Sequence, residues 1–88
     1  MESLGFIESK GYVPFFSVAD AMVKAANVEI IKKVGIGAGQ VTIIVKGDIS
    51  AIKAAIDAGV LIANKYNGLV GSYIIARPTE EILSFILK

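Results

Sequence analysis

The chain has 88 residues, which is enough for a single domain over 1–88 and too few for a second hydrophobic core. Hydrophobic residues make up 55% of the sequence and charged residues 19%, the net charge is +1, and the chain contains neither Cys nor His. This composition excludes disulfides, thiolate metal sites and imidazole catalysis, and it lacks the strongly basic balance typical of nucleic-acid binding.

The N-terminal half predicts a strand, a helix and two further strands. Apolar residues alternate with small or polar ones over 3–9 and predict the first strand. Ser17 is a favourable N-cap residue, and the apolar residues behind it recur at helical spacing, which predicts a helix over 17–26. A β pattern resumes over 28–34. The β-branched run over 40–46 is the strongest strand signal in the chain.

The C-terminal half predicts a helix, a strand and a short helix. Asp48 is the expected N-cap of a long amphipathic helix over 49–66, and Thr79 is that of the final helix. Between them, a strand over 69–76 ends before Arg77. The order β-α-β-β-α-β-α predicts an α/β (α+β) domain with one four-stranded, mainly antiparallel sheet and its helices on one face.

The apolar content is larger than a domain of this size can bury, so part of it must face lipid or another protein. The longest uncharged run covers 34–45, twelve residues, and falls short of the roughly 20 needed to span a bilayer. Self-association is therefore the expected outlet for the surplus. We expect no membrane partner, no nucleic-acid partner, no metal and no cofactor.

Three alternating glycines, Gly35, Gly37 and Gly39, mark the loop between the second and third predicted strands. A dinucleotide-binding fingerprint would need a further glycine where Gln40 or Thr42 stands, and a helix where a strand is predicted. A hairpin turn explains the loop on spacing alone. A backbone that passes close to other copies of itself would also need glycines, because they carry no side chain.

Five motifs occur in the order and at the spacing found in a known family, and the match runs without a gap over nearly all of the chain. They cover Leu4 to Gly11, Asp20 to Val28, the Ile36-Gly37-Ala38-Gly39 loop, Lys46 to Ile49 with Ala54 to Gly59, and Arg77-Pro78. The sequence resembles the single-domain, hexamer-forming shell protein of bacterial microcompartments, the BMC type. The resemblance implies a BMC fold, no enzymatic activity, and a cyclic homohexamer that tiles into a sheet enclosing metabolic enzymes.

The resemblance also implies site residues, partners and a location. The pore loop, through which small metabolites would pass, corresponds to Gly35, Ile36, Gly37, Ala38 and Gly39. The edge between neighbouring hexamers corresponds to Lys24, Asn27 and Arg77. The implied partners are the chain itself, other shell proteins, and the encapsulated enzymes or their targeting peptides. The implied location is the microcompartment shell within the cytoplasm.

The chain departs from the family pattern in its pore loop. Gly35 stands where many relatives carry a lysine, and Ala38 where a serine often lines the narrowest point. Both departures remove polar groups, so the charge selectivity of the family does not carry over. Lys32 and Lys33 either set a positive rim or face solvent.

Phe15 and Phe16 are also larger than the resemblance leads us to expect, and they are either helix packing or a partner patch.

A competing hypothesis from another class is a small ligand-binding regulatory α/β module whose glycine loop holds an effector. An enzyme is the weakest of the three hypotheses. It would depend on the scattered carboxylates Glu8, Asp48 and Asp57, and the capping role already accounts for Asp48.

Overall fold

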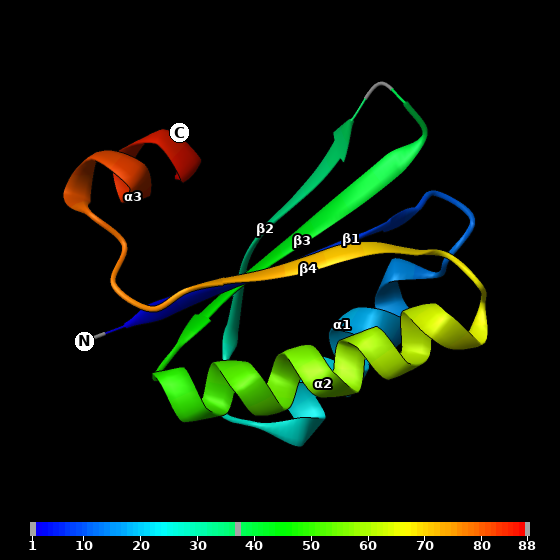
Figure 1. Ribbon diagram of the computed structural model, residues 1–88, viewed down its shortest axis with the longest axis horizontal. Helices are drawn as coiled ribbons and strands as arrows, with labels where there is room; N and C mark the ends of the chain where they lie inside the picture. The colour runs from blue at the N-terminus through cyan, green and yellow to red at the C-terminus, as the bar shows by residue number, and fades with distance from the viewer. Residues whose placement is uncertain (1, 37, 88) are drawn as a thin grey trace.

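The protein consists of four strands and three helices, seen in a computed structural model that describes residues 2–36 and 38–87 (Figure 1). The elements are β1 (Ser3–Lys10), α1 (Phe15–Ala25), β2 (Glu29–Ile36), β3 (Gln40–Gly47), α2 (Ile49–Lys65), β4 (Leu69–Ile75) and α3 (Glu80–Ile86). Their order confirms the predicted β-α-β-β-α-β-α sequence.

The four strands form one antiparallel sheet in the order β2-β3-β1-β4. β1 lies inside the sheet and pairs with β3 along its whole length, from Ser3 opposite Gly47 to Lys10 opposite Gln40. β4 covers the other side of β1, and β2 pairs with β3. The predicted α/β class, the antiparallel sheet and the β2–β3 neighbours are therefore confirmed, and β2 and β4 are the two edges.

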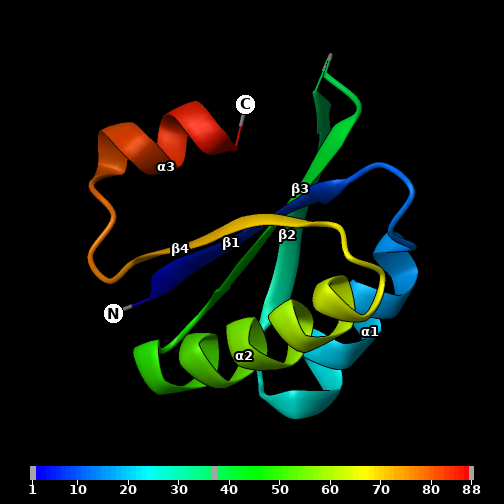
Figure 2. The ribbon, with the colours of Figure 1, turned by 45° about the vertical axis from the view of Figure 1, so that its right-hand side comes forward.

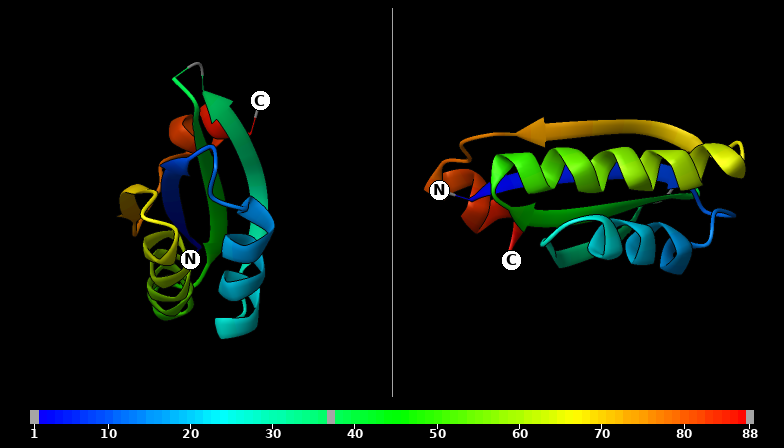
Figure 3. Two further views of the ribbon diagram at one scale, coloured as in Figure 1. Left: turned by 90° about the vertical axis from the view of Figure 1, so that its right-hand side faces the viewer. Right: turned by 90° about the horizontal axis from the view of Figure 1, so that it is seen from below.

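α1 and α2 lie side by side on one face of the sheet, and the hydrophobic core lies between them and the strands (Figures 2 and 3). Its centre is made by Ile7, Val18, Met22, Ile43, Val45, Ile52 and Ala63, all at most 1% exposed. A methyl group on Gly59 would overlap Ile7 and Met22. The missing side chain at Gly59 thus lets α2 approach both β1 and α1 closely.

α3 lies over the opposite face of the sheet, apart from the other two helices (Figures 1 and 2). In β1, a side chain at Gly5 would point at Ile52 and Ile56 of α2. Successive side chains of a strand point to opposite faces, so Leu4 faces the other way, where it lines a pocket together with Leu83 of α3. The short third helix therefore lies on the face that the first two leave bare, so the prediction that the helices lie on one face holds for α1 and α2 and is wrong for α3.

The start of α1 differs from the sequence prediction. The helix begins at Phe15, Pro14 is its N-cap, and no side chain caps it. Pro14 has φ −65°, the value to which its ring restricts it and one suited to helix entry. Ser17 lies inside the first turn and its N–H donates to the Pro14 carbonyl at 3.0 Å. The predicted Ser17 cap is thus wrong, because Pro14, three residues earlier, sets the entry geometry of the helix.

The other two predicted caps are confirmed. Asp48 Oδ1 accepts hydrogen bonds from the backbone N–H groups of Ser50 and Ala51, both at 3.0 Å, and begins α2. Thr79 Oγ1 accepts from the N–H of Ile82 at 3.2 Å and begins α3. The Ala51 N–H, followed by the Ser50 side chain, holds the pKa of the Asp48 carboxyl below its ordinary value.

Candidate functional site

Gly35, Ala38 and Gly39 lie at the end of a long β2–β3 hairpin that extends away from α1 and α2 (Figure 1). Gly35 and Ile36 belong to β2, where Gly35 pairs with Val41 and Ile36 with Gln40. The loop predicted over 35–39 is thus shorter than expected, because glycine keeps its backbone donors and acceptors and the ladder continues through it.

The backbone of the turn shows why position 39 is a glycine. Gly39 has φ +74°, in the left-handed region that glycine adopts without strain, and Ala38 beside it is exposed. The N–H of Gly11, in the β1–α1 connection, donates to the Gly39 carbonyl at 2.7 Å and braces the turn. Gly37, the remaining predicted loop residue, lies outside the described residues. β3 follows the turn, so the turn does not open a helix as a phosphate-binding loop does.

Gly35 has no packing partner that would demand glycine. A side chain added there would meet no atom within 4 Å. Its φ does not lie in the left-handed region either, where, among the glycines that the structure describes, Gly39 lies. Nothing within one described chain therefore requires glycine at position 35.

Lys32 and Lys33 both lie against their own chain. Lys32 Nζ donates to the Ile86 carbonyl near the end of α3 at 2.8 Å, and Lys33 Nζ lies 3.9 Å from the centroid of the Phe15 ring. Phe15 packs against the core, in agreement with the helix-packing alternative. The neighbouring Phe16 is 75% exposed, with its ring centroid 4.1 Å from that of Phe15.

The three predicted edge residues lie on the surface of separate segments. Lys24, in the last turn of α1, forms an i,i+4 ion pair with Asp20 at 3.0 Å, and both side chains are mostly exposed. Asn27 follows α1, Arg77 follows β4, and both are exposed. No hydrogen bond or ion pair found among residues 2–36 and 38–87 joins any two of these three residues, so in one chain they form no common site.

The carboxylates considered for an enzyme do not come together. Asp48 caps α2, Asp57 is exposed on the same helix, and Glu8 is half-buried in β1. Within the described part of the chain no group of metal-ligating side chains is assembled. None of the helices described is long and apolar enough to cross a membrane.

Large apolar side chains remain exposed on several sides of the chain. They are Tyr12, Phe16, Val23, Ile30, Ile49, Leu61, Tyr66, Val70, Tyr73, Ile74, Ile82, Phe85 and Leu87. Composition predicts this surplus, but its distribution over α1, α2, β4 and α3 could not be read from the sequence, because it depends on which helix faces meet the sheet.

Comparisons with known proteins agree with this architecture. A family model described as the BMC domain matches residues 3–78. The chain is 43% identical to the carboxysome shell protein CcmK2 of Synechocystis, over 91% of this chain and 80% of that protein. It is 41% identical to the bacterial microcompartment shell protein PduA of Citrobacter freundii, over 99% and 94%. It is 44% identical to the shell protein EutM of Escherichia coli, over 100% and 94%.

One solved structure with the same fold is a microcompartment protein from Desulfitobacterium hafniense. It superposes with a TM-score of 0.85 at 26% sequence identity and covers 99% of this chain. The chain spans 47% of the length of that protein.

Proposed function

Because the chain belongs to the BMC-domain family, whose members named above are shell proteins and not enzymes, we propose that it forms cyclic homohexamers that tile into a microcompartment shell. Its role is structural. The hexamer, the tiling and the pore are the proposal, and each depends on a separate feature of the chain.

The distribution of exposed apolar side chains is the observation that carries the proposal. In a ring, each subunit presents two different surfaces, one to each neighbour. Leu61 on α2 is 65% exposed, and Tyr73 and Ile74 on β4 are 53% and 38% exposed, while Phe16 and Val23 on α1 are 75% and 43% exposed. These residues come from separate elements, as a subunit with two neighbours requires. Burying them would remove apolar surface that a lone chain leaves in water.

The β2–β3 hairpin is the proposed pore element. Gly35, Ile36, Gly37, Ala38 and Gly39 would meet their symmetry copies on the hexamer axis. The open space around Gly35 supports this placement, because glycine there has no function inside one chain but would let copies approach one another. Since Lys32 and Lys33 contact groups of their own subunit, Ala38 methyls and backbone groups would line a pore with little fixed charge.

Lys24, Asn27 and Arg77 are the proposed contacts between hexamers. All three are exposed and lie on different segments, so they can meet across a boundary between rings without meeting inside a chain. The sheets formed in this way would lie within the cytoplasm and enclose enzymes, alone or together with other shell proteins. The encapsulated enzymes or their targeting peptides would be further partners.

Two measurements test the proposal together. Native mass spectrometry should show a homohexamer, and negative-stain electron microscopy of the concentrated protein should show extended sheets. A stable monomer would contradict the hexamer. Discrete dimers or trimers that bind a nucleotide would instead favour a regulatory module built on the glycine loop.

A further inference from the structure

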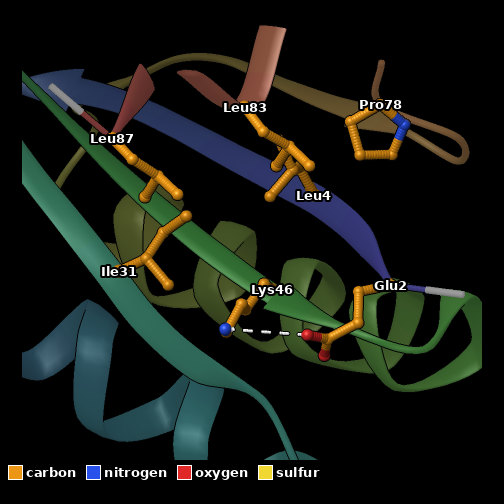
Figure 4. A pocket seen from close by; sticks show the side chains of 7 residues that line it. All are labelled: Glu2, Leu4, Ile31, Lys46, Pro78, Leu83 and Leu87. Atoms are coloured by element: carbon orange, nitrogen blue, oxygen red, sulfur yellow. Dashed lines mark ion pairs between the residues drawn. The ribbon is translucent and has the colours of Figure 1, made fainter. Parts of the chain in front are cut away.

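A pocket lies between α3 and the face of the sheet that α1 and α2 leave uncovered (Figure 4). Its volume is about 330 Å³, within the range of sites that hold small organic molecules. It is lined by Glu2, Leu4, Ile31, Lys46, Pro78, Leu83 and Leu87. The shell function proposed above makes no use of this pocket.

The walls of the pocket are aliphatic. Leu4 is 1% exposed and belongs to β1; Leu83 of α3 lies beside it, and Leu87, the C-cap of α3, points toward Ile31 (Figure 4). Ile31 and Pro78 complete the wall without an aromatic ring. An alkyl chain is the ligand that such walls fit, because dispersion contacts and removal of apolar surface from water are the interactions they offer.

One end of the pocket carries a cation with unused hydrogen-bond donors. Lys46 Nζ lies 3.6 Å from Glu2 Oε1 and 3.7 Å from Glu29 Oε1, so both contacts are ion pairs too long for hydrogen bonds. An ammonium has three donors, and no hydrogen bond within residues 2–36 and 38–87 uses those of Lys46. A ligand oxygen placed beside Lys46 could therefore accept a hydrogen bond without breaking one within the described part of the protein.

The charges around Lys46 determine which kind of ligand oxygen fits beside it. Lys46 and Glu2, the two charged residues that line the pocket, pair with each other at 3.6 Å, so this end of the pocket carries no net charge. A ligand carboxylate would be repelled by Glu2 and Glu29, and a ligand ammonium would be repelled by Lys46 and could not accept its hydrogen bond. We propose that the pocket binds a small aliphatic molecule that ends in an uncharged hydrogen-bond acceptor, such as a primary alcohol.

α3 completes the pocket, and a hydrogen bond from Lys32 helps to hold it there. The Lys32 ammonium donates to the Ile86 carbonyl at 2.8 Å, close to the negative end of the helix. Leu83 belongs to this helix and Leu87 is its C-cap, so the pocket exists while α3 lies on the sheet. Leu83 and Leu87 can therefore be substituted without changing the core beneath α1 and α2.

Saturation-transfer difference NMR on the assembled full-length protein tests the proposal, since it detects weak ligands on large particles. The probes are n-hexanol, hexanoate and hexylammonium at equal concentration. We expect n-hexanol to receive saturation and to bind at least about fivefold more tightly than either charged probe, because each charged probe places a like charge beside Glu2 or Lys46. No saturation of n-hexanol would overturn the site, and equal or tighter binding of either charged probe would overturn the assignment of its polar end.

Matched variants localise the binding. Leu83→Trp should fill the pocket and abolish the n-hexanol signal, whereas Phe85→Trp, on the same helix at a residue 76% exposed, should leave it unchanged. Lys46→Met removes the donor but keeps an apolar side chain, and it should weaken the binding of n-hexanol about tenfold. Lys53→Met, at an exposed residue of α2, is the control. Equal effects within either pair would contradict the proposed site.

Discussion

Lys24→Ala separates the stability of one chain from the assembly of hexamers. The lost ion pair with Asp20 joins side chains that are 75% and 58% exposed, and an exposed i,i+4 pair is worth about 0.3–0.5 kcal/mol. Alanine has a higher helix propensity than lysine, and this stabilises the helix by roughly a few tenths of a kcal/mol. The free energy of unfolding should therefore change by less than about 0.5 kcal/mol, and native mass spectrometry should still show hexamers.

Sheet formation should respond much more strongly. If each contact between hexamers is worth about 0.5 kcal/mol, six symmetry-related copies sum to about 3 kcal/mol per hexamer, or roughly a hundredfold in the association constant. The concentration at which sheets appear, followed by light scattering and negative-stain electron microscopy, should rise accordingly.

Asp20→Ala is the matched control for this experiment. It breaks the same ion pair but keeps the Lys24 ammonium, which projects from the end of α1. We expect it to form sheets at nearly the parent concentration. If both variants lose sheets equally, the ion pair within the helix matters and not a contact between hexamers. If Lys24→Ala forms sheets as readily as the parent, Lys24 is an ordinary solvated lysine.

Three further predictions concern the edge residue Arg77, the turn between β2 and β3, and the N-cap of α2. Arg77→Ala should weaken sheets and leave hexamers intact, measured by the same scattering assay; loss of hexamers would instead place Arg77 inside the ring. Ala38→Leu should close the pore by steric bulk, and Gly35→Lys, which has open space in the chain, should shift single-channel conductance toward anions; unchanged conductance in both would argue against a pore at this turn. Because the Ala51 N–H lowers the pKa of Asp48 below its ordinary value of 3.8, the ionised cap stabilises α2 above that pH and stops doing so as the pH falls through the lowered pKa. The difference in unfolding free energy between the parent and Asp48→Ala should accordingly be present at neutral pH and shrink in acid, and a difference independent of pH would contradict the hydrogen-bonded carboxylate.

Local features of the fold were predictable because their causes lie within a few residues. Asp48 and Thr79 cap α2 and α3 through N–H groups two or three residues away, which a sequence displays directly. The β-branched run over 40–46 predicts β3 in the same way. Ser17 failed as a cap because Pro14, another local signal, already begins the helix.

Contacts between distant segments were not predictable. Lys32 and Lys33 look alike in the sequence, yet one reaches the Ile86 carbonyl and the other covers the Phe15 ring. The strand sends consecutive side chains to opposite faces, and what each one meets depends on helices elsewhere in the chain. The idea of a positive rim formed by both lysines therefore required the tertiary structure for its assessment.

The sequence by itself determined the α/β class, the order of the elements, the surplus of apolar side chains and the family resemblance, all of which follow from composition, periodicity and motif order. Only the tertiary structure decided that α3 crosses to the second face, that Gly35 has open space around it, and that Leu4 and Leu83 enclose a pocket with Lys46 at one end. The physical reason is range: hydrogen bonds and periodicity act along a few residues, whereas packing depends on where the whole chain places each surface.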